Sequence, residues 1–139
     1  MTAKVNRQER LQQALALAGI VKTVLVATAD ADGLPHVAVA GKTDVLADGR
    51  FAVSEWFCPG TVSNLEKNPR ISLVVWQRVS DTGYQLTGEV EQVEELAFLN
   101  GYLPEEKGAR AVPQTERRLT VRVTTVIPFS RAPHTDQGR

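Results

Sequence analysis

The sequence has few of the residues from which disulfide, thiol and metal sites are built. It holds one cysteine, Cys58, and two histidines, His36 and His134, in 139 residues. A lone cysteine cannot form an internal disulfide, and these three residues do not have the spacing of metal ligands. We therefore expect no disulfide framework and no metal site. Cys58 has no neighbouring base to activate it, so redox sensitivity is the only alternative left for its thiol.

Net charge and long apolar segments are also absent. Sixteen basic residues balance sixteen acidic ones, so no overall field attracts nucleic acid or an anionic surface. The apolar runs fall well below the roughly 18 residues of a membrane span. The opening segment MTAKVNRQERLQQ lacks the apolar centre of a signal peptide. We expect a cytoplasmic protein with no nucleic-acid partner and no membrane partner.

What the chain does contain is enough apolar sequence for one folded domain. Apolar residues make up 42% of it, and we expect a single domain over residues 1–130, followed by a loose tail at 131–139. The domain should open with an amphipathic helix that Asn6 caps and Gly19 ends. The apolar face of that helix is formed by Leu11, Ala14, Leu15 and Ala18.

Valine-rich and threonine-rich segments separated by tight turns predict about six antiparallel strands and a mainly β fold that curls into a barrel or sandwich. These segments are residues 20–30, 34–46, 47–55, 70–79, 84–93 and 117–129. Turns are expected at Asp30–Gly33 and Asp48–Gly49, and a bulge at Gly88. Residues 94–103 have a helical rhythm, and residues 103–115 read as a polar loop.

A short helix from Thr61 to Lys67 interrupts the strands. Thr61 stands at the expected N-cap, and Asn64 is three residues further on. The free amides and positive dipole end of such a terminus can bind an anion, and Gly60 would let the backbone approach it closely. The alternative is that Thr61 only caps its own helix, as threonine commonly does.

Two segments together carry a resemblance to a known family. They are GLPHVAVAGKTDVLADGRFAVSEWFCPGTVSNLEKNPRISLVVWQ, at 33–77, and GYQLTGEVEQV, at 83–93. Their order and spacing resemble the FMN-binding split-barrel proteins related to pyridoxamine 5'-phosphate oxidase, in particular the small single-domain members. The resemblance implies a six-stranded antiparallel split β-barrel of Greek-key type with small flanking helices. It also implies a homodimer with the flavin site at the subunit interface.

Carried over position by position, the resemblance implies cofactor-binding roles for one set of residues and leaves catalytic residues unknown. The set is Val39, Ala40, Gly41, Lys42, Ser54, Glu55, Gly60, Thr61, Asn64 and Gln85. Thr61 corresponds to the phosphate-binding hydroxyl, and residues 39–42 to the strand under the isoalloxazine ring. This chain departs from the family pattern at Gly60, where a lysine is usual, so a cation near the phosphate is missing.

The function implied is an FMN-dependent oxidoreductase that carries out two-electron redox chemistry on a small molecule, with a nicotinamide as one possible donor. The sequence leaves alternatives open. One is a flavin carrier or redox sensor without turnover, and another is a dimeric scaffold that has lost its cofactor. A deazaflavin in place of FMN is a further alternative.

Overall fold

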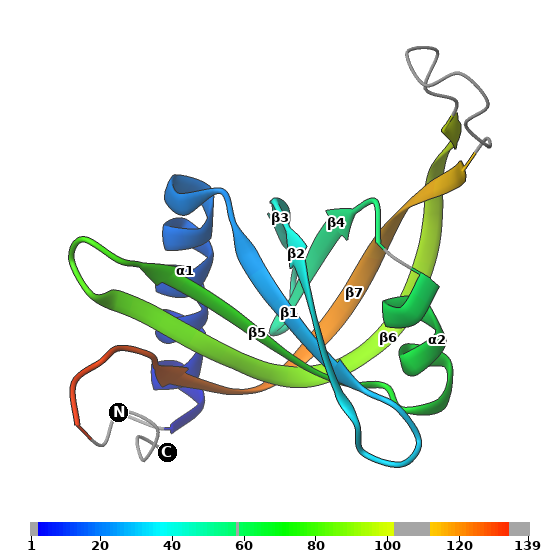
Figure 1. The fold of residues 1–139 in the computed structure, drawn as a ribbon. Coiled ribbons are helices and arrows are strands. Elements are labelled where there is room, and N and C mark those ends of the chain that lie inside the picture. Colours follow the sequence, from blue (N-terminus) through cyan, green and yellow to red (C-terminus); the bar gives the residue numbers. More distant parts are fainter. Residues whose placement is uncertain (1–2, 58, 102–111, 134–139) are drawn as a thin grey trace.

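The computed structural model describes residues 3–57, 59–101 and 112–133, which form two helices and seven strands. In chain order these elements are α1 (Ala3–Val21), β1 (Val24–Ala29), β2 (Pro35–Ala40), β3 (Lys42–Val45), β4 (Arg50–Glu55), α2 (Pro59–Lys67), β5 (Arg70–Gln77), β6 (Thr82–Gly101) and β7 (Val112–Pro128). The strands make one antiparallel sheet in the order β2-β1-β5-β6-β7-β4-β3, which curls without closing (Figure 1). The predicted mainly β, antiparallel split barrel is confirmed.

The strand count is seven rather than six because the predicted strand at 34–46 is divided at Gly41. The first half, β2, pairs with β1, whereas the second half, β3, pairs with β4. The two halves therefore lie at opposite ends of the sheet order. A Cβ atom on Gly41 would lie 3.3 Å from the carbonyl oxygen of Lys22. The missing side chain thus lets the chain pass close to the end of α1.

Helix α1 covers the sheet with the apolar face that the sequence predicts. It packs against β3, β5, β6 and β7, and Leu11, Ala14, Leu15 and Ala18 are all buried. Its predicted ends were wrong. Asn6 lies within the helix rather than at its cap, and the helix passes Gly19 to end at Val21. Lys22, with φ 60°, makes the left-handed turn that stops it.

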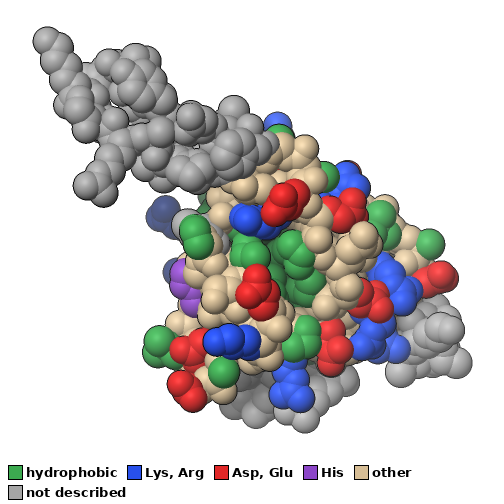
Figure 2. Space-filling view, turned by 90° about the vertical axis from the view of Figure 1, so that its right-hand side faces the viewer, with side chains coloured by type: hydrophobic (Ala, Val, Ile, Leu, Met, Phe, Trp, Pro, Cys, Tyr) green, Lys and Arg blue, Asp and Glu red, His purple; other side chains and the backbone are tan. Residues whose placement is uncertain are grey.

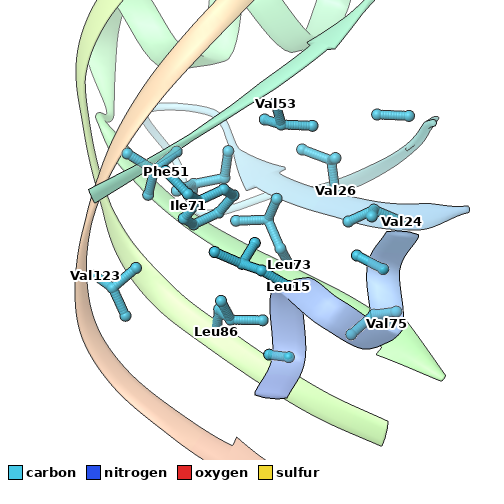
Figure 3. Close-up of a cluster of buried hydrophobic side chains, with 14 of the residues drawn as sticks. Leu15, Val24, Val26, Phe51, Val53, Ile71, Leu73, Val75, Leu86 and Val123 are labelled. Atoms are coloured by element: carbon cyan, nitrogen blue, oxygen red, sulfur yellow. The ribbon is translucent and has the colours of Figure 1, made fainter. Parts of the chain in front are cut away.

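The hydrophobic core lies between α1 and the concave side of the sheet (Figure 3). Side chains from α1, β1, β4, β5, β6 and β7 meet there, and those drawn in the figure include Leu15, Val26, Phe51 and Leu73. Phe51 and Leu73 are each only 1% exposed. Removing this apolar area from water is the main stabilising contribution to the fold.

The predicted third helix, at 94–103, was wrong, because residues 94–101 continue strand β6. They pair with β7 as far as Gly101 opposite Val112, so residues 112–115 of the predicted loop are also strand. A helix of that length is marginal alone, whereas pairing places Glu94 opposite Arg118 and Glu95 opposite Arg117. The two strands project from the barrel as a ribbon (Figure 1).

The predicted turns and the bulge are confirmed. Gly33 and Gly49 have φ of 87° and 73°, as tight hairpin turns require. The pairing of β6 with β7 shifts register between Thr87 and Gly88. No helix in the described part of the chain is long and apolar enough to span a membrane. Cys58, His134 and the end of the predicted tail lie outside the described residues.

Candidate functional site

Helix α2 begins at Pro59, two residues before its predicted start. Thr61 therefore lies in the first turn and is not the N-cap. Proline is favoured at this position because its missing N–H would have no acceptor inside the helix. The amides of Gly60 and Thr61 belong to the same turn, where amides lack intrahelical acceptors. Gly60 is exposed, so the helix still presents free donors and the positive end of its dipole.

The side chain of Thr61 faces into the protein. Thr61 is 0% exposed, and its Oγ1 lies 3.2 Å from Nε2 of His36, a residue of β2. His36 itself is half-buried. A ligand above the start of the helix would therefore meet the imidazole before it met the threonine hydroxyl.

Asn64 lies one turn further along α2 and is held in the same way. Its Nδ2 donates a hydrogen bond of 3.1 Å to Oγ1 of Thr28, a β1 residue that is 4% exposed. Thr28 and His36 are direct partners in the β1–β2 pairing. Thr28, His36, Thr61 and Asn64 thus form one group of polar side chains, which we call the α2 cluster.

A second group of predicted residues meets where β2 passes into β3, beside the end of β4. Lys42 is paired with Ser54, and Oε2 of Glu55 lies 3.8 Å from the position of a Cβ atom on Gly41. Ser54 is only 4% exposed, and Oε1 of Glu55 accepts a hydrogen bond of 2.9 Å from the Trp56 amide. The structure therefore brings together four predicted residues, Gly41 between β2 and β3, Lys42 of β3, and Ser54 and Glu55 of β4.

Arg118 of β7 adds a donor to this second group. It is paired with Ser54 across the β4–β7 ladder. Its Nε is buried and has no hydrogen-bond partner among the described residues. Because a buried donor without an acceptor costs about 1–3 kcal/mol, such an atom usually indicates a missing partner. The Nζ atom of Lys42, in contrast, already lies 3.8 Å from the Oε2 atom of Glu116.

Of the remaining predicted residues, Ala40 is buried in the hydrophobic core, whereas Val39 and Gln85 lie on the convex face of the sheet. Val39 is paired with Leu25 of β1. Leu25 is in turn paired with Val74 of β5, and Val74 with Gln85 of β6. Nε2 of Gln85 donates a hydrogen bond of 2.9 Å to Oγ of Ser72. Val39 and Gln85 are three strand spacings apart, about 14 Å. Thr28 and His36 belong to the opposite face of β1 and β2, so Gln85 is not brought to the α2 cluster.

The side of the molecule that carries α2 is mixed in character. Figure 2 shows hydrophobic side chains near the centre of this face, with acidic and basic groups interspersed around them.

A hollow of about 720 Å³ lies elsewhere, between α1 and the β4 and β7 strands. Its arginines already have partners, since Arg7 donates to the carbonyl of Thr124 and Arg122 pairs with Glu89. None of the residues that line this hollow belongs to either group of predicted residues.

The shifted acid groups also lie outside both groups of predicted residues. The Trp76 indole N–H and then the Arg131 amide hydrogen-bond to the Asp81 carboxylate and lower its pKa. The hydrogen bond from Arg50 similarly lowers the pKa of Glu91.

Sequence reasoning did not identify Thr28, His36 or Arg118 as members of the site. For Thr28 and His36 a signal was present, because the predicted turn at Asp30–Gly33 sets the hairpin register that places them opposite each other. For Arg118 no local signal exists, because its position depends on β4 pairing with β7. In the sequence, Arg118 is one of several arginines on a strand whose alternating pattern is typical of a half-exposed strand.

Solved structures with similar folds include proteins of several descriptions. HupZ from Group A Streptococcus is 20% identical, with a TM-score of 0.59 over 87% of this chain and 94% of that one. An FMN-binding protein from Syntrophomonas wolfei subsp. wolfei is 16% identical, with a TM-score of 0.61 over 93% and 92%. An F420 reductase is 15% identical, with a TM-score of 0.55 over 80% and 93%. Such identities show a common fold and no more.

The sequence matches no curated protein. It does match the sequence model of a family described as pyridoxamine 5'-phosphate oxidase, over residues 11–132. This match spans most of the chain and includes both α2 and the β2–β3 break. The resemblance inferred from the motifs is confirmed: the chain belongs to the pyridoxamine 5'-phosphate oxidase family.

Proposed function

We propose that this protein binds FMN and uses it for two-electron oxidation or reduction of a small molecule. The observation that carries the proposal is the exposed start of α2 at Gly60, directly beside the polar α2 cluster. Free backbone amides at a helix start suit a phosphate group. Family membership and the similarity to proteins described as FMN-binding support the same cofactor.

The residues present fit such a cofactor in chemical terms. The amides of Gly60 and Thr61 would take the phosphate, and the backbone at Gly41 and Lys42 would face the polar edge of the ring system. The unpartnered Nε of Arg118 is a buried donor suited to an oxygen acceptor. When bound, FMN supplies the electron transfer, and the protein supplies binding, orientation and exclusion of water.

An absorption spectrum tests the proposal directly. We expect flavin bands between about 300 and 600 nm, either in the purified protein or after incubation with FMN and desalting, at close to one flavin per chain. FMN should also raise the melting temperature, because a ligand that binds only the folded state stabilises it. Reduction of the bound flavin by a nicotinamide, followed by transfer to an acceptor, would separate an enzyme from a carrier or sensor. A colourless protein whose melting temperature FMN does not change would contradict the proposal and favour a scaffold.

A deazaflavin is the second candidate cofactor, and the similarity to an F420 reductase favours it. Both cofactors offer a ring system and a phosphate-containing side chain to the same residues. Titrating the protein with each in turn distinguishes them, because the physiological cofactor should bind the more tightly.

We further propose that the protein is a homodimer whose subunits meet through the convex face of β2 and β1. Leu34, Val37 and Val39 are 68%, 61% and 57% exposed, and Leu25 beside them is 43% exposed. Grouped apolar side chains of this kind commonly mark a protein interface. A second copy with the same apolar face is the occupant that would cover them, as closed two-fold dimers do.

Val37→Lys tests the interface without changing a proposed cofactor residue. We expect twice the chain mass for the parent by analytical ultracentrifugation and a shift toward the monomer for the variant, because a charge would be buried at the contact. Val79→Lys is the matched control, since Val79 is 98% exposed on the β5–β6 turn. A parent that stays monomeric at every concentration, or a Val37→Lys variant that remains dimeric, would contradict the proposal.

A further inference from the structure

The start of α2 carries no basic side chain. The first turn contains Pro59, Gly60 and Thr61, and the only lysine of the helix, Lys67, is at its other end. A phosphate monoester carries close to two negative charges at neutral pH. Backbone amides alone would have to balance that charge unless another element supplies a cation.

His36 lies where such a cation is needed. A Cβ atom built on Gly60 would be 3.6 Å from Cε1 and 3.8 Å from Nε2 of the His36 imidazole. These are ordinary van der Waals distances, so a side chain at position 60 would begin in contact with the ring. The imidazole of β2 thus borders the space into which a lysine at position 60 would extend.

Thr61 fixes the orientation of this ring. Its Oγ1 is 3.2 Å from Nε2, and Thr61 is fully buried. The other ring nitrogen, Nδ1, has no hydrogen-bond partner among the described residues. Nε2, the ring nitrogen nearer to Gly60, is therefore held by Thr61, whereas Nδ1 lies more than 4 Å from the Cβ position of Gly60 and is the ring nitrogen still open to a ligand. Holding one ring nitrogen in this way is how proteins commonly set which histidine nitrogen is presented to a partner.

We propose that His36 is the side chain that binds the cofactor phosphate in this protein, in place of a lysine at position 60, and that Thr61 is its positioning residue. The inference rests on the proposed FMN site at the start of α2. Imidazole is the side chain that most readily gains a full positive charge near neutral pH. A phosphate beside it favours the charged form and a charge-assisted hydrogen bond.

Comparing FMN with riboflavin isolates the phosphate contact, because riboflavin has the same ring and ribityl chain without the phosphate. We expect His36→Ala to weaken FMN binding by about tenfold and to leave riboflavin binding unchanged. His36→Gln should lose nearly as much, since an amide can still bond to Thr61 but carries no charge. Thr61→Val should lower FMN affinity by about threefold through loss of ring orientation. Dissociation constants come from flavin fluorescence, and circular dichroism verifies that each variant is folded.

A compensating change sharpens the test. In the His36→Ala background, Gly60→Lys should restore FMN affinity to within about threefold of the parent without changing riboflavin affinity. If the parent binds FMN but His36→Ala and His36→Gln bind it equally well, the role of His36 is wrong and the FMN site stands. Equal losses of FMN and riboflavin would make His36 a structural residue and would also overturn the inference. A parent that binds neither flavin would overturn the proposed function, and the inference with it.

Discussion

Gly88→Ala is expected to lower the free energy of unfolding by about 3 kcal/mol. Gly88 is buried at the register shift between β6 and β7. A methyl group there would collide with the carbonyl oxygen of Arg122 and lie 3.0 Å from its carbonyl carbon. Both atoms belong to the backbone of β7, so they cannot move aside without disturbing the β6–β7 ladder.

The matched control is Gly19→Ala, the same chemical change in a place with room for it. A Cβ atom on Gly19 meets nothing within 4 Å, and the residue lies in helix α1. Alanine is the better helix former, so this variant should be more stable than the parent by about 0.5 kcal/mol. Urea unfolding followed by circular dichroism measures both. If Gly88→Ala were as stable as the parent, the bulge at this position would be wrong.

Leu73→Ala should also be costly, at about 3 kcal/mol within the usual range of 2–5 kcal/mol for such truncations. Leu73 is 1% exposed and lies in the core cluster beside Leu15 of α1 (Figure 3). Truncation removes buried apolar contacts and leaves a cavity that the surrounding strands can only partly fill. The same urea experiment measures the loss.

Leu34→Ala makes the same truncation at a residue that is 68% exposed, and we expect a change within about 0.5 kcal/mol. A second readout connects stability with function. The Leu73 side chain faces the core, away from the proposed cofactor site, so FMN should raise the melting temperatures of Leu73→Ala and the parent equally. A Leu73→Ala variant as stable as Leu34→Ala would contradict the assignment of Leu73 to the core.

Features set by neighbouring residues could be predicted from the sequence. The turns at Asp30–Gly33 and Asp48–Gly49, the bulge at Gly88 and the apolar face of α1 each depend on a few adjacent side chains. The ends of α1 and the start of α2 were displaced by two or more residues, and the larger errors arose where distant pairing decided the structure. Residues 94–101 have a helical rhythm, yet they are strand because β7 offers them a full ladder of hydrogen bonds. The predicted strand at 34–46 is divided at Gly41 because its two halves, β2 and β3, pair with different strands.

In the candidate site, too, local features could be predicted from the sequence and long-range contacts could not. Thr61 and Asn64 could be identified because they stand in one short motif, whereas their hydrogen-bond partners could not. Thr61 meets His36 across 25 residues, and Asn64 meets Thr28 across 36 residues. Those contacts require the β1–β2 hairpin to form and α2 to dock on it. No motif in the sequence encodes that docking by itself.

The order of strands in the sheet has a consequence for how the chain reaches its native state. Tight turns join β1 to β2, β3 to β4 and β5 to β6, so these pairs can form by local search. The remaining contacts between such units are distant in sequence: Leu25 pairs with Val74, and Phe51 with Val121. Forming each of these pairs costs the conformational entropy of a long loop before the buried contacts stabilise it. Non-local closure of this kind slows folding. The helix start at Gly60 lies within both of these loops, so the proposed binding site is completed only when the slowest part of the sheet has assembled.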